Sequence, residues 1–173
     1  MKSVLISIRP KWCELIASGK KTIEVRKTAP KLPTPFKCYI YCTSVKSMNL
    51  EDYVDAISIS TAVNDWSGKV FGEFVCDLIG FHPGTDVPSS CVPIEELKKY
   101  ANGKMLARWH ISDVKIYDQP RELRSFWKAD KCPYATESGC TYKYHCFRAG
   151  QIQRCGETLT RPPQSWRYVE EMP

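Results

Sequence analysis

A short stretch near the N-terminus, ASGKKTIEVRK over residues 17–27, concentrates the side chains best suited to chemistry. Lys21, Glu24 and Arg26 lie within a span of six residues. Arginine offers a rigid fork of donors, lysine a point charge, and glutamate two acceptor oxygens. Such a trio can hold a phosphate or a planar polar ligand. The alternative is an ion-pair network on an exposed sheet face, which the spacing by itself favours.

The elements predicted around the trio are a strand, a short helix and a second strand. The apolar run at 4–8 predicts a buried strand, and a proline start with a glycine stop predicts a helix over 10–18. The second strand is predicted over 22–26. Because side chains alternate along a strand, Glu24 and Arg26 are expected on one face, lining a cleft.

Other side chains near the trio could contribute to such a cleft. We expect Lys21, at the corner between helix and strand, to be free to swing over it. Arg9 lies upstream of the trio, and Lys11 and Lys27 are further basic residues near it. Trp12 could supply a stacking surface for a base, although a place on the buried face of the helix is the favoured interpretation.

The pattern Gly-x-Lys-x-x-Glu-x-Arg, formed by Gly19, Lys21, Glu24 and Arg26, resembles the signature of the ASCH domain, a β-barrel related to the PUA domain. The resemblance is close over residues 1–27 and looser beyond them. The stretch LTRPPQSWRYVEE resembles the tail of a bacterial and phage subgroup. The resemblance to the ASCH domain implies a cleft that binds RNA or a nucleotide, by analogy with PUA domains. Lys21 and Arg26 would then contact phosphate or base acceptors, and Glu24 would accept from base or sugar donors.

An enzymatic alternative also follows from the resemblance. Some small members of this superfamily resemble amidohydrolases of acylated cytidines, which use the motif lysine, a threonine three residues later, and a glutamate. Lys21 matches the lysine, but Glu24 stands in place of the threonine nucleophile. A hydrolase or ribonuclease would therefore need Glu24 as general base and Lys21 as the polarising group, with Glu73 as a possible second carboxylate. A binding module is favoured.

The cysteines suggest a separate site. The chain has 9 cysteines, and no export signal is evident, so we expect a cytoplasmic protein without a disulfide framework. A structural zinc site is predicted from the cluster in the C-terminal segment, namely Cys132, Cys140, Cys146 and Cys155, with His145 as an alternative ligand. The spacing contains no CxxC pair. Reduced cysteines in an ordered loop, or a disulfide, are therefore the alternatives.

Charge is distributed unevenly along the chain. The net charge is +6, and residues 1–37 hold 9 Lys or Arg against 2 Asp or Glu, whereas residues 38–97 hold 2 against 9. The basic segments suit an anionic partner such as RNA or a nucleotide. Basic and aromatic residues interleave in the Cys-rich segment, which suits single-stranded nucleic acid or, alternatively, contact with a protein partner.

The predicted fold is α+β: a small mixed, mainly antiparallel PUA-like β-barrel with short flanking helices. Residues 1–128 are expected to form the barrel, and residues 129–173 a Cys-rich segment with a final strand that packs back on it. Further strands are predicted over 37–42, 69–81 and 109–117, and a helix over 93–100. Hydrophobic residues make up 43% of the chain, but no run is long enough to span a membrane. The oligomeric state is left open.

Overall fold

The computed structural model describes residues 2–44, 65–84, 87–129 and 158–172, together with the backbone of two strands at 145–148 and 151–154. The strands are β1 (Lys2–Ile8), β2 (Ile23–Arg26), β3 (Phe36–Cys42), β4 (Val70–Cys76), β5 (Ile79–His82), β6 (Leu106–His110), β7 (Ser112–Arg121), β8 (His145–Arg148), β9 (Gln151–Arg154) and β10 (Trp166–Glu170). The helices are α1 (Pro10–Ala17) and α4 (Ile94–Ala101), with 3₁₀ turns η2 (Pro88–Ser90) and η3 (Leu123–Ser125). This confirms the predicted α+β class.

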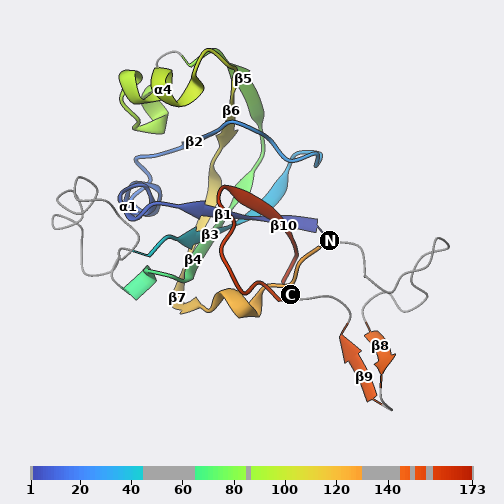
Figure 1. The fold of residues 1–173 in the computed structure, drawn as a ribbon. Coiled ribbons are helices and arrows are strands. Elements are labelled where there is room, and N and C mark those ends of the chain that lie inside the picture. The colour runs from blue at the N-terminus through green and yellow to red at the C-terminus, as the bar shows by residue number, and fades with distance from the viewer. Residues whose placement is uncertain are drawn as a thin grey trace.

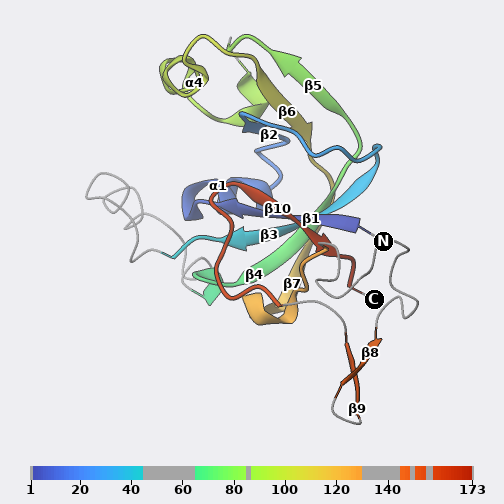
Figure 2. The ribbon, with the colours of Figure 1, turned by 45° about the vertical axis from the view of Figure 1, so that its right-hand side comes forward.

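The strands form two larger sheets. One is five-stranded with the order β10-β1-β3-β4-β7, and the other is three-stranded with the order β2-β6-β5. All pairings in them are antiparallel except that of β1 with β3. The ladders found in the described residues do not join these sheets into one closed barrel. Figures 1 and 2 show α4 next to the three-stranded sheet and α1 beside β1.

Aromatic side chains connect the two sheets. Trp109 on β6 is fully buried. Its indole lies edge-on to Phe36 of β3, with ring centroids 6.0 Å apart, and 5.9 Å from Trp166 of β10. Burying rings of this size accounts for a large share of the stabilisation available to a small domain. The packing of these rings therefore holds the two sheets together.

Two predicted strands are each divided in the structure, and both predictions of one continuous strand were wrong. The predicted strand 69–81 is β4 followed by β5, and the predicted strand 109–117 is the end of β6 followed by β7. At both breaks the chain crosses from one sheet to the other. Asp77 follows β4 at one crossing and His110 ends β6 at the other, and a contact of 2.6 Å between His110 Nδ1 and Asp77 Oδ1 links the two crossings. Apolar patterning reports burial, but it does not report which sheet buries a residue.

The first helix forms and ends as predicted. Pro10 occupies its first turn, and the Ser18 amide donates to Glu14 O at 2.9 Å. Gly19 then adopts φ = 72°, a left-handed conformation that glycine reaches without a Cβ penalty. The chain reverses, and the Lys21 amide donates to Leu15 O at 2.9 Å. This turn directs Lys21 toward the start of β2.

No helix in the described ranges is both long enough and apolar enough to cross a bilayer.

Candidate functional site

Lys21 is the most deeply buried member of the trio, with 1% of its surface exposed. Its Nζ donates to Ile23 O at 2.8 Å and to Ser90 O at 2.6 Å, and it pairs with Glu24 Oε2 at 3.2 Å. An ammonium has three donors, so these partners use all of them. The expectation that Lys21 swings freely over a cleft is therefore wrong. A buried charge is tolerated only where it is paired and hydrogen-bonded, which holds this side chain in place.

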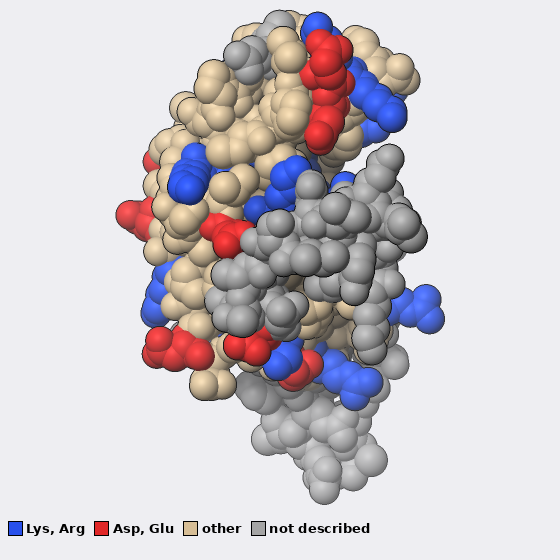
Figure 3. Space-filling model, turned by 90° about the vertical axis from the view of Figure 1, so that its left-hand side faces the viewer, with Lys and Arg blue, Asp and Glu red and all other residues tan. Residues whose placement is uncertain are grey.

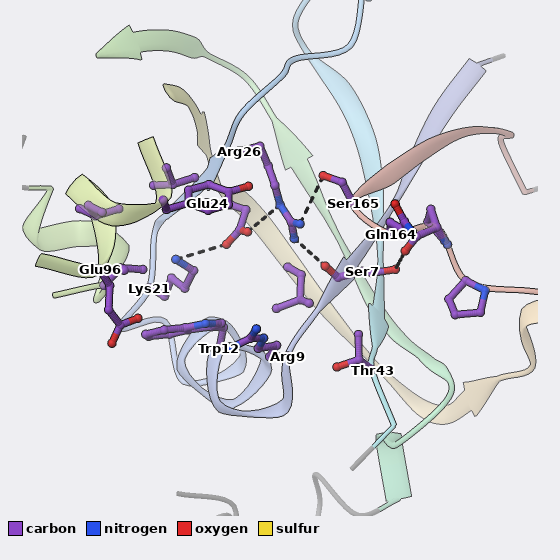
Figure 4. Close-up of a pocket in the computed structure, with 17 residues that line it drawn as sticks. Ser7, Arg9, Trp12, Lys21, Glu24, Arg26, Thr43, Glu96, Gln164 and Ser165 are labelled. Atoms are coloured by element: carbon purple, nitrogen blue, oxygen red, sulfur yellow. Dashed lines mark hydrogen bonds and ion pairs between the residues drawn. The ribbon is translucent and has the colours of Figure 1, made fainter. Parts of the chain in front are cut away.

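Arg26 connects the two sheets. Its Nε lies 2.9 Å from Glu24 Oε1, and its Nη2 donates to Ser7 O of β1 at 2.5 Å. Its Nη1 makes a longer contact of 3.4 Å with Ser165 Oγ, in the segment that leads into β10. Lys21, Glu24 and Arg26 thus form one network in which each carboxylate oxygen faces a cation, as Figure 4 shows.

A pocket of about 590 Å³ lies beside this network. The residues predicted from the sequence to bind a ligand all line it: Arg9, Trp12, Lys21, Glu24 and Arg26. Its volume falls in the range of small-ligand sites. The structure therefore brings together side chains from β1, α1 and β2 around one opening.

Trp12 fits both interpretations offered by the sequence. It is half-buried and packs against the main core, yet it also lines the pocket. The Nζ atoms of Lys11 and Lys21 lie 5.1 and 5.3 Å from the indole ring, within cation–π range. The ring is thus held between the core and the cavity.

Part of the pocket wall was missed at the sequence level. Thr43 follows β3, Glu96 and Tyr100 lie on α4, and Gln164 precedes β10. These residues reach the pocket only because α4 packs on the three-stranded sheet and because β10 pairs with β1. The prolines at 162–163, in the stretch LTRPPQSWRYVEE, also line the pocket.

Glu73, the second carboxylate of the enzymatic alternative, lies outside the pocket, and so does His110. Glu73 accepts a hydrogen bond of 2.5 Å from the Tyr117 hydroxyl and pairs with Lys37 at 3.6 Å on the five-stranded sheet. His110 is engaged with Asp77, and its hydrogen bond holds the pKa of that carboxyl below its usual range. Neither residue is in position to act on a ligand in the pocket.

The predicted zinc ligands are not tested by the structure. Cys132, Cys140 and Cys155 lie outside the described residues, and the strand that carries His145 and Cys146 is described by its backbone alone. In the part of the chain that is described with side chains, no group of three or more His, Cys, Asp or Glu could hold a metal. Its cysteines are free thiols: Cys13, Cys38, Cys42, Cys76 and Cys91.

Basic and acidic side chains are interspersed on the face seen in Figure 3. The segregation of charge along the sequence does not produce a surface of one sign among the described residues of this face. Inside the pocket the lining charges are those of Arg9, Lys21 and Arg26 against Glu24 and Glu96, a small positive excess. This suits a ligand of low negative charge better than a polyanion.

Comparison with known proteins identifies relatives of this architecture. A family model described as the ASCH domain matches residues 6–153. The fold is similar to that of ASCH from Zymomonas mobilis, with a TM-score of 0.57 and 16% identity over 98% of this chain and 88% of that chain. A mutant of the Zymomonas mobilis protein, in which phenylalanine replaces a tyrosine, gives a TM-score of 0.52 and 19% identity over 71% of this chain and 77% of that chain. No curated protein matches the sequence.

Proposed function

Because the chain belongs to the ASCH domain family, whose fold is PUA-like, we propose that its pocket binds a nucleotide, either free or as a unit of single-stranded RNA. The observation that carries the proposal is the pocket itself, where Arg9 and Trp12 lie beside the Lys21–Glu24–Arg26 network. A cationic side chain next to an indole is the pairing that single-stranded nucleic acids use, since it combines phosphate contact with base stacking.

The buried network and the pocket rim have different roles in this proposal. Lys21 directs its donors into the protein, so it shapes the inner wall rather than contacting phosphate. Arg26 retains one weakly used donor, Nη1, whose contact with Ser165 is 3.4 Å long. We therefore assign phosphate contact to Arg9 and Arg26 Nη1, and base stacking to Trp12.

The ion pairs of Glu24 favour binding over hydrolysis. A general base needs a free oxygen within reach of the proton that it accepts. Both oxygens of Glu24 face cations, Oε2 toward Lys21 at 3.2 Å and Oε1 toward Arg26 at 2.9 Å. Removing a proton from a substrate would break this network, so we assign Glu24 to positioning.

Calorimetric titration with nucleoside monophosphates and a short single-stranded RNA tests the proposal. Arg9→Gln is expected to weaken binding about tenfold, because it removes a cation from the pocket. Lys20→Gln is the matched control: Lys20 is exposed near the motif and does not line the pocket. Binding should also weaken as salt is raised.

Equal losses in the two variants would show that general charge, not the pocket, drives binding. The absence of binding by any nucleotide or RNA would overturn the proposal. Capture of a protein partner that tolerates changes in the pocket would favour an interaction module instead.

A further inference from the structure

Glu96 is a pocket residue that the network does not use. It lies in the first turn of α4 and lines the cavity with an exposed carboxylate. In the part of the chain described here, no cation lies within 4.0 Å of it. The neighbouring Glu95 differs, since it pairs with Lys98 at 3.0 Å and does not line the pocket. Two adjacent glutamates on one turn therefore have different surroundings.

The pocket has opposite charges at its two ends. Figure 4 draws Glu96 and Arg9 on opposite sides of the Trp12 indole. Between them, Lys21, Glu24 and Arg26 are paired with one another and carry a net charge of +1. A ligand that lies over the indole thus meets a cation at one end and a carboxylate at the other.

This inference rests on the proposed function, because it names the kind of nucleotide that the pocket takes. We propose that Glu96 selects nucleotides whose base carries an exocyclic amino group, at the purine 6-position or the pyrimidine 4-position. An ionised carboxylate only accepts hydrogen bonds, so it attracts an amino group and repels a carbonyl oxygen in the same place. With its phosphate toward Arg9, a stacked base directs its amino edge toward Glu96.

The contrast between matched ligands follows from this geometry. Adenine and cytosine present an amino group where hypoxanthine and uracil present a carbonyl oxygen. The wild-type protein should therefore bind AMP more tightly than IMP, and CMP more tightly than UMP, by about five- to tenfold. Phosphate groups stay at the other end of the pocket, so this preference does not depend on ligand charge.

Calorimetric titration of these four nucleotides tests the inference in the wild type, Glu96→Gln and Glu95→Gln. A glutamine amide can both donate and accept, so Glu96→Gln should reduce each preference to about twofold or less. Glu95→Gln removes the same charge from the same turn and should leave the preferences unchanged. The titrations are run with EDTA, so that no cation bridges phosphate to carboxylate.

The outcomes separate this inference from the proposed function. If all four nucleotides bind the wild type equally, or if Glu96→Gln keeps the preference, selection by Glu96 is wrong and nucleotide binding stands. The same holds if Glu95→Gln abolishes the preference as well. If none of the four nucleotides binds, selection by Glu96 is overturned, and the proposed function falls with it only if the single-stranded RNA also fails to bind.

Discussion

At the scale of single residues, the motif that resembles a ligand-binding signature is first a structural element. Lys21 bridges β2 to η2 through Ile23 O and Ser90 O, and Arg26 bridges β2 to β1 through Ser7 O. Glu24 pairs with both cations, one through each carboxylate oxygen. A ligand therefore meets a wall that is already assembled, which lowers the entropic cost of ordering side chains on binding.

Lys21→Met should destabilise the protein by about 3 kcal/mol, because Glu24 Oε2 and two carbonyl oxygens lose the buried ammonium that they contact. Chemical denaturation measures the loss. Lys20→Met is the control, since Lys20 is exposed and its replacement should change stability by about 0.5 kcal/mol or less. Equal stabilities for the two variants would contradict the buried network.

The motif residues could be found from the sequence because their arrangement is local. A helix stop at Gly19 and alternation along one strand are enough to bring Glu24 and Arg26 to one face. The burial of Lys21 could not be found, because its partner Ser90 is 69 residues away in the chain. Glu96 was missed for the same reason: nothing in its neighbourhood along the chain indicates that α4 borders a pocket.

At the scale of secondary structure elements, β4 approaches β7 closely at Gly72. The pairing register shifts next to this glycine in both neighbouring ladders. A Cβ atom there would lie 2.6 Å from Lys115 O of β7, a backbone atom that cannot move aside cheaply. The bulge therefore depends on glycine.

Gly72→Ala is expected to lower the free energy of unfolding by about 1–3 kcal/mol through this clash. Gly80→Ala on β5 is the matched control, because a Cβ there meets nothing within 4 Å. It should be neutral or slightly stabilising. Urea denaturation of both variants is the measurement, and a larger loss at Gly80 than at Gly72 would refute the account of the bulge.

The element boundaries show where sequence reasoning reached its limit. Helix α1 and strand β2 were predicted closely, since proline, glycine and alternation are local signals. The crossings at 77–78 and near Ile111 were not predicted, because only the tertiary arrangement assigns the strands on either side of each crossing to different sheets.

At the scale of the whole molecule, buried thiols and phenols make stability depend on pH in the alkaline range. Burial raises the pKa of Cys76 to about 12, helped by the charge of Asp77. Burial, together with the hydrogen bond to Glu73, also raises the pKa of Tyr117. In the unfolded chain these groups return to their ordinary values near 9 and 10. The folded state therefore holds its protons more tightly.

The resulting stability contribution is fully present below about pH 9 and is lost as pH rises toward the folded-state pKa of Cys76. We expect the free energy of unfolding to fall steadily between about pH 9 and pH 11. Denaturation curves across this range measure it. In Cys76→Ala the decline should be shallower, and a stability that stays constant to pH 11 in the wild type would be inconsistent with these buried groups.

The central claim is that one pocket, assembled from distant segments, binds a nucleotide. The most direct test is an amide NMR titration of the full chain with AMP. The account predicts shifts that concentrate on the pocket-lining segments around Trp12, Arg26, Glu96 and Ser165, with little change on β7, which does not line the pocket. Shifts centred on β7, or no shifts at AMP concentrations of about 1 mM, would contradict it.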